Sequence, residues 1–182
     1  MKTQIHFPSH IRSHSGFTLI EVVVAAGIAS IVFAAVALFS AYTARSFVAI
    51  GNYAELDGAS RNALDVMSRE IRQTRGLITF KTNQVAFQDY DNVTLTYTWD
   101  PVTATLKRTK SGSTTTLLKQ CDFLNFGISQ RNPSNNFNFY PTTNIANAKL
   151  IDVNWSCSRG ILQRKVNTES VQTAKIVIRN QP

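Results

Sequence analysis

The sequence predicts an α+β fold in which one long N-terminal helix packs against a C-terminal antiparallel β-sheet. Two changes of pattern along the 182-residue chain predict it. Residues 22–44 carry no charged side chain, and apolar residues then recur at intervals of three and four up to residue 71, which marks one face of a helix. After Gly76 the apolar residues alternate with a period of two, as in strands with one buried face. We therefore expect a helix from about residue 17 to residue 75 and strands beyond it.

The first sixteen residues differ from the remainder in charge and in histidine content. They hold all three histidines, His6, His10 and His14, and two basic residues without an acid. The whole chain has a net charge of +8, and residues 17–182 have +6, from 17 basic and 11 acidic residues. A chain cut after Gly16 would contain no histidine, which excludes Ser/His and Cys/His nucleophile pairs and imidazole zinc sites. Since P-loop, GxGxxG and CxxC motifs are also absent, the sequence predicts no enzyme and no cofactor.

One carboxylate interrupts the start of the apolar segment. Glu21 closes the string GFTLIE, and the uncharged residues 22–44 follow it directly. That segment is long enough to cross a bilayer, since about 20 helical residues span roughly 30 Å. A carboxylate in such a helix costs roughly 2.5–3.5 kcal/mol on insertion scales unless it has a partner. The sequence therefore predicts a single membrane span and a cation that pairs with Glu21.

The string GFTLIE resembles the class III leader of type IV prepilins and pseudopilins. In that family a prepilin peptidase cuts after the glycine, here Gly16, and methylates the new amine, here on Phe17. The acid at the fifth mature position, here Glu21, pairs with the amine of a neighbouring subunit. The resemblance implies a leader at residues 1–16 and an inner-membrane and assembly segment at residues 17–44. The alternative for Glu21 is an acid that reaches the membrane surface and has no role in assembly.

Residues 45–75 are predicted to form the amphipathic half of the helix. The apolar face comprises Phe47, Ile50, Tyr53, Leu56, Ser60, Leu64, Met67 and Ile71. We interpret its part from residue 53 onward as core packing. On another face Asp57, Arg61, Asp65 and Arg69 alternate in sign at a spacing of four, which is typical of a solvated face.

Residues 76–182 are predicted to form a β domain in the periplasm or outside the cell. The expected strands are 77–81, 85–88, 93–99, 104–109, 114–119, 123–129, 150–157 and 175–179. The turn signals Asp100-Pro101 and Ser111-Gly112 favour consecutive hairpins. Residues 130–147 are rich in asparagine and are expected to form a long loop. Its aromatic residues Phe137, Phe139 and Tyr140 are candidates for a subunit contact, or they pack back onto the sheet.

Cys121 and Cys157 are the only cysteines. In an oxidising compartment two cysteines on strands commonly pair, so a disulfide is predicted, with two buried thiols as the alternative. Asp89, Asp91 and Asn92 lack the full spacing of a calcium loop and are interpreted as a polar turn, so no metal is predicted.

Lys107, Arg108 and Lys110 form a basic group on one predicted hairpin. Such residues can contact phosphates, but basic turns are usually solvated. Binding of nucleic acid is therefore a possible function that the sequence does not favour.

Three further strings, SRNALDVMSREIRQTRG, LLKQCDFLNFGI and AKLIDVNWS, are similar to J-type minor pseudopilins and related minor pilins. This resemblance implies a low-abundance subunit of a type II secretion pseudopilus or type IV pilus that helps to initiate or cap the filament. The implied partners are the prepilin peptidase/methyltransferase, other minor and major pilins or pseudopilins, and the inner-membrane assembly platform. The alternative is a DNA-binding minor pilin of a DNA-uptake (competence) system.

Overall fold

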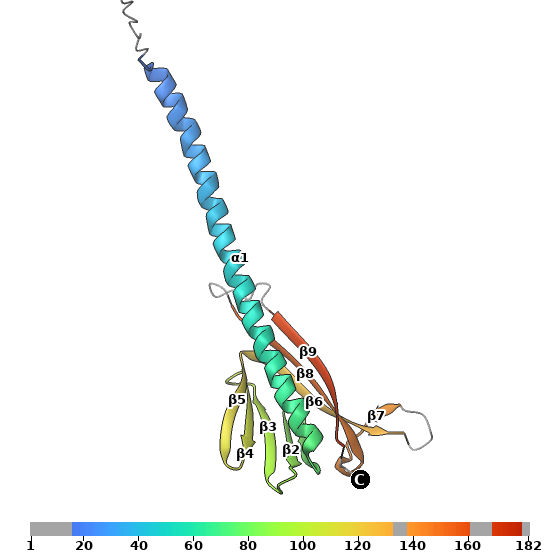
Figure 1. Ribbon diagram of the computed structural model, residues 1–182. Coiled ribbons are helices and arrows are strands. Elements are labelled where there is room, and N and C mark those ends of the chain that lie inside the picture. The colour runs from blue at the N-terminus through green and yellow to red at the C-terminus, as the bar shows by residue number, and fades with distance from the viewer. Residues whose placement is uncertain (1–15, 133–137, 161–168, 180–182) are drawn as a thin grey trace, which may run out of the picture. The chain divides into compact units, whose positions relative to one another are not determined.

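A computed structural model describes residues 16–132, 138–160 and 169–179. In this part of the chain the elements are, in order, α1 (Leu19–Gln73), β1 (Gly76–Lys81), β2 (Gln84–Gln88), β3 (Thr94–Asp100), β4 (Thr105–Lys110), β5 (Ser113–Lys119), β6 (Cys121–Arg131), β7 (Phe139–Pro141), the 3-10 helix η1 (Ile145–Asn147), β8 (Ala148–Ser158) and β9 (Glu169–Val177). One long helix followed by antiparallel strands confirms the predicted α+β class (Figure 1).

The chain divides into two compact units, residues 1–44 and residues 45–182. The first unit contains the N-terminal part of α1, and between residues 19 and 42 every side chain is exposed. The second unit contains the rest of α1 and all the strands. In the described residues, α1 is the one helix that is long and apolar enough to cross a membrane.

The strands form two antiparallel sheets, whereas we expected one. The first has the order β1-β2-β3-β4-β5 and the second has the order β7-β6-β8-β9. The change of sheet falls at Gln120, the single residue between β5 and β6, where a φ of 58° turns the chain. Positive φ is uncommon for residues other than glycine. Because no glycine or proline marks this position, the sequence did not reveal the break, and the single-sheet prediction was wrong.

Two backbone hydrogen bonds join the two sheets. The amide of Phe126 donates to the carbonyl of Thr82 (2.8 Å), and the amide of Cys121 donates to the carbonyl of Ala104 (2.9 Å). The first bond connects the β1–β2 turn with the middle of β6, and the second connects the β3–β4 turn with its start. The two sheets therefore share one continuous core.

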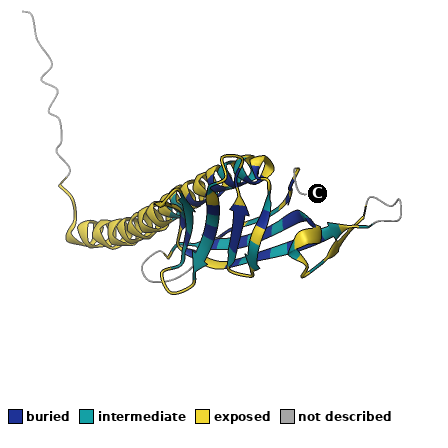
Figure 2. Ribbon diagram, turned by 90° about the horizontal axis from the view of Figure 1, so that it is seen from below, coloured by how far each residue is buried: buried dark blue, intermediate teal, exposed yellow. Residues whose placement is uncertain are grey.

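The C-terminal part of α1 covers one face of both sheets (Figure 2). From the helix Leu56, Ser60, Ala63, Met67 and Ile71 are buried. The largest fully buried side chains of the strands are Phe87, Leu95, Tyr97, Leu106, Leu118, Phe126, Ile151, Trp155 and Ile176. The predicted core packing of the helix therefore holds from Leu56 onward, while Tyr53 remains 49% exposed.

Side-chain hydrogen bonds join α1 to the second sheet and to Arg159, which follows β8. The side-chain amide of Gln172 on β9 donates to Asp57 at 3.3 Å. The indole nitrogen of Trp155 donates to the hydroxyl of Ser60 at 3.3 Å, inside the core. Arg159 donates to a carboxylate oxygen of Glu55 at 2.6 Å. The polar residue in the predicted apolar stripe, Ser60, is thus an acceptor for a buried tryptophan, which would otherwise lack a partner for its N–H.

The structure describes part of the asparagine-rich segment 130–147. Its residues 133–137, including Phe137, lie outside the described residues. The remainder forms β7, which pairs with the end of β6, and then η1. Phe139 and Tyr140 are 41% and 46% exposed, so they are neither fully packed on the sheet nor fully free. Its suggested role in a subunit contact stays a prediction.

Strand β9 is longer and begins earlier than expected. It runs from Glu169 to Val177, whereas the sequence led us to expect residues 175–179. Alternate residues, Ile176 among them, point into the core, while Val171 and Val177 are exposed. The start of β9 is polar because β9 is an edge strand with one solvated face. These polar residues hid the period of two in the sequence.

Candidate functional site

The predicted processing site lies in a non-helical, exposed segment. Gly16, Phe17 and Thr18 precede α1, and Phe17 is 80% exposed. A Cβ added at Gly16 would meet no atom within 4 Å. A protease could therefore reach the peptide bond between Gly16 and Phe17 without unwinding a helix.

Thr18 caps the N-terminus of α1. Its hydroxyl accepts a hydrogen bond from the backbone N–H of Glu21 at 3.3 Å. The amide of Val22 donates to the Thr18 carbonyl at 3.2 Å, which closes the first helical turn. These contacts define an N-cap, because one of the four unpaired donors at the helix start is satisfied by the cap side chain. Thr18 was not predicted from the sequence, although the T-x-x-E spacing of a capping box signals it.

Glu21 lies in the first turn of α1 and its side chain is exposed. A carboxylate in the first turn is favoured by the helix dipole. Within the described residues no basic group forms an ion pair with Glu21. The cation that the sequence predicts for it therefore stays a prediction, and it would have to come from outside this part of the chain.

Two hydroxyl groups of the apolar helix segment bond to the helix itself. Ser30 donates to the carbonyl of Gly27 at 2.7 Å, and Thr43 donates to the carbonyl of Phe39 at 2.9 Å. Such bonds satisfy a hydroxyl without water, which makes Ser and Thr compatible with a lipid environment.

In the second unit, Cys121 and Cys157 are both buried and are direct cross-strand partners on β6 and β8. The amide of Ser158 donates to the carbonyl of Gln120, which identifies the cysteines as a non-hydrogen-bonded pair. At such pairs the Cα atoms are about 4.5 Å apart, within the range that a disulfide requires. A hydrogen bond to Cys157, together with burial, raises the pKa of the Cys121 thiol. The structure has two free thiols here, and the disulfide stays a prediction.

Glu70 of α1 forms a polar cluster with two strands. The hydroxyl of Tyr97 donates to Glu70 at 2.5 Å, and Arg108 binds both carboxylate oxygens, at 2.6 and 2.8 Å. Burial raises the pKa of Glu70, but the hydrogen bonds from Arg108 and Tyr97 and the charge of Arg108 outweigh it, so this pKa lies below its ordinary value. Burial and the adjacent carboxylate raise the pKa of Tyr97. The cluster connects the helix with β3 and β4.

Lys110 is enclosed by acids and an aromatic ring. Its ammonium group forms ion pairs with Asp89 and, at 3.2 Å, with Asp91. It also lies 5.3 Å from the centre of the Tyr90 ring, within the range of a cation–π contact. The carboxylates that the sequence analysis considered as calcium ligands therefore hold a lysine.

The predicted basic group is divided by these contacts. Arg108 pairs with Glu70 and Lys110 pairs with two aspartates, so their charges are compensated. Lys107 has no ion pair within the described residues. The structure thus does not bring Lys107, Arg108 and Lys110 together as an open cationic surface, and contact with nucleic acid stays an untested prediction.

A family model for the prokaryotic N-terminal methylation motif matches residues 11–37. No curated protein matches the chain. The match spans the exposed segment before α1, Glu21 and the first part of the apolar helix. Together with the helix-then-sheets architecture, the match supports a type IV pilin-like protein with a prepilin-type N-terminus.

Proposed function

We propose that this protein is a low-abundance structural subunit of a type II secretion pseudopilus or a type IV pilus, which helps to initiate or cap the filament and has no catalytic activity. The observation that carries the proposal is the methylation motif placed on an exposed, non-helical Gly16–Phe17 bond directly before an apolar helix. The minor-subunit role rests on the similarity of three strings to J-type minor pseudopilins and minor pilins.

In this proposal the prepilin peptidase cuts after Gly16 and methylates the amine of Phe17. Cleavage removes the residues before Phe17 and creates a cation four residues from Glu21 along the chain. Within one subunit, the Thr18 hydroxyl already accepts a hydrogen bond from the backbone amide of Glu21, and this bond fixes the first helical turn. The Glu21 carboxylate is left to pair with the amine of a neighbouring subunit, because neither charge is stable alone in an apolar environment.

The apolar side chains at residues 19–42 support the same proposal. They are all exposed in the isolated chain, so they need lipid before assembly and other subunits afterwards. The partners would be other minor and major subunits and the inner-membrane assembly platform, with the second unit in the periplasm or outside the cell. A DNA-uptake role receives less support, because Arg108 and Lys110 are already paired with acids.

The decisive experiment is intact-mass analysis of the protein from cells with and without a prepilin peptidase. We expect a form that begins at methylated Phe17 only when the peptidase is present. Gly16→Ala should largely prevent cleavage, although the structure has space for the added methyl group. Gly27→Ala is the matched control, since a Cβ there also meets nothing within 4 Å, and it should be processed normally. Retention of the leader in peptidase-positive cells would refute the proposal.

A further inference from the structure

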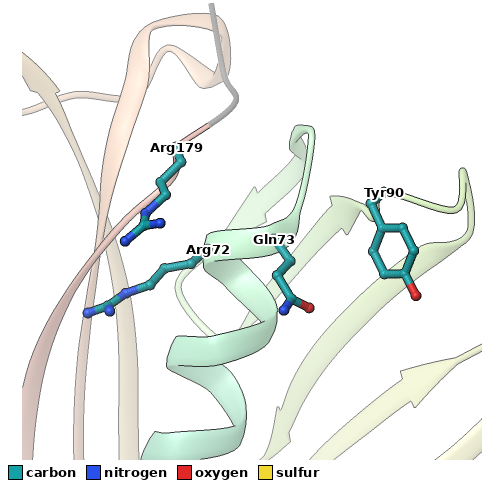
Figure 3. Close-up of a pocket in the computed structure, with 4 residues that line it drawn as sticks. All are labelled: Arg72, Gln73, Tyr90 and Arg179. Atoms are coloured by element: carbon teal, nitrogen blue, oxygen red, sulfur yellow. The ribbon is translucent and has the colours of Figure 1, made fainter.

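A groove of about 500 Å³ lies at the C-terminal end of α1, within the second unit. It is lined by Arg72 and Gln73 from the last helical turn, Tyr90 from the β2–β3 turn, and Arg179 after β9. Figure 3 shows the side chains of Arg72 and Arg179 on the same side of the helix end, with Gln73 and Tyr90 on its other side. Three separate parts of the chain therefore build this groove.

Among the residues that the structure describes, the two arginines have no counter-ion. Within the described residues neither Arg72 nor Arg179 forms an ion pair or a side-chain hydrogen bond. By contrast, Arg108, Lys110 and Arg159 each bind a carboxylate. Two guanidinium groups that face one space repel each other unless an anion lies between them.

We propose that this groove binds an acidic segment of a partner protein, with carboxylates on Arg72 and Arg179. Guanidinium groups bind carboxylates through two parallel hydrogen bonds, and so give both charge and direction. The exposed ring of Tyr90 and the amide of Gln73 extend the site across the helix end, where they can contact the rest of such a segment. The net charge of +8 also favours an acidic partner over a second copy of this chain.

The surroundings of Tyr90 favour a short acidic segment over nucleic acid. Asp89 and Asp91 flank Tyr90, and together with Lys110, which both of them bind, they leave a net charge of −1 at that end of the groove. A regular polyanion that continued from the arginines toward Tyr90 would meet this charge, whereas a peptide can present an uncharged residue there.

The test uses the full-length protein in detergent micelles and a fluorescent Glu-Glu-Gly-Gly peptide, which offers two carboxylates and then uncharged residues, at low ionic strength. We expect Arg72→Gln/Arg179→Gln to weaken peptide binding by about tenfold or more. Arg72→Lys/Arg179→Lys should be intermediate, because it keeps the charge and loses the planar fork. The matched control is Arg69→Gln/Lys175→Gln, which removes two exposed cations, one from the same helix and one from β9 four residues before Arg179, and should change affinity by less than about twofold.

Three results would overturn the inference. These are equal losses in the control and test variants, no peptide binding by the wild-type protein, or an arginine-dependent affinity for a single-stranded oligonucleotide in place of the peptide. The assay does not require filament assembly or leader cleavage. A negative result here therefore leaves the proposed subunit role intact, and failure of that role leaves this site testable.

Discussion

The two parts of helix α1 both carry apolar side chains but differ in what surrounds these side chains. In the first unit the apolar side chains between residues 19 and 42 are all exposed. In the second unit Leu56, Met67 and Ile71 are at most 4% exposed, because they pack against the strands. An apolar surface of the first kind exceeds what a soluble protein normally shows, and it indicates an environment outside the chain. The same helix thus exposes an apolar surface at one end and packs into the core at the other.

The prediction with the largest expected effect is that truncation can separate these two parts of the chain. A chain that begins at Arg45 should be soluble and folded, because every residue of the hydrophobic core lies at or beyond Leu56. Fractionation and circular dichroism check this. A chain that begins at Gly58 is the informative comparison, since it loses Leu56 and the Glu55 partner of Arg159 and should be less stable. Aggregation of the longer fragment would contradict the division.

The second prediction concerns the first unit alone. Glu21→Val should insert into membranes at least as well as wild type, since it removes a charge from the apolar segment. Its incorporation into the filament should fall, because the neighbour's amine loses its partner at a cost of roughly 3–5 kcal/mol. Glu21→Gln should be intermediate. Co-purification with partner subunits from membranes measures the effect.

Thr18→Ala is the control for this effect. It removes the helix cap, worth about 1 kcal/mol, and keeps the carboxylate. If assembly follows the cap rather than the charge, the proposed pairing of Glu21 is incorrect. Normal complex formation by Glu21→Val would lead to the same conclusion.

The third prediction tests the second unit. If Cys121 and Cys157 form a disulfide in the cell, alkylation without reduction should label neither, and intact mass should show the oxidised form. The bond would close a 36-residue loop (157 − 121) and add about 3–4 kcal/mol in the chain-entropy model. Reduction should therefore lower the urea midpoint of the second unit and leave membrane anchorage unchanged. Full alkylation of protein taken directly from its compartment would show that the thiols are free.

The smallest effect is a pH dependence at Glu70. Its pKa lies below the ordinary 4.5 in the folded state, so the contribution of this carboxylate to stability is present above about pH 4.5 and is lost as the pH falls through the folded-state pKa. Glu70→Gln should lower the free energy of unfolding by about 2 kcal/mol at pH 7. It should also make this free energy fall less steeply as the pH is lowered. Asp65→Asn, an exposed acid on the same helix, is the control and should have little effect. Urea unfolding at several pH values measures both.

The sequence was sufficient to predict the helix, most strands and the burial pattern, because these follow from local periodicity. Leu56, Met67 and Ile71 stood out by their spacing and are buried. The division into two sheets was not predictable, since a period of two shows which face of a strand is buried and not which strands are neighbours. Gln120, where the sheets part, has no distinctive residue type.

The candidate site was predictable to a different degree in each unit. The string GFTLIE carries its chemistry in contiguous residues, so Gly16, Phe17 and Glu21 could be named from sequence. The contacts of the second unit join distant residues: Arg108 meets Glu70 across 38 positions, and Arg72 lies beside Arg179 only because β9 ends at the same place as the helix. Without the fold, a basic run such as Lys107, Arg108 and Lys110 looks like an open surface.

The order of the strands has a consequence for the time course of folding. In the first sheet each strand pairs with the next one along the chain, so every pairing closes a short loop. The second sheet closes only when β9 arrives, and Trp155 reaches Ser60 across 95 positions. Since long loops close more slowly, we expect β1–β5 to form first and the contacts of β9 last. A chain that is still being translocated into its compartment would then have a folded first sheet while half of its core stays exposed to solvent.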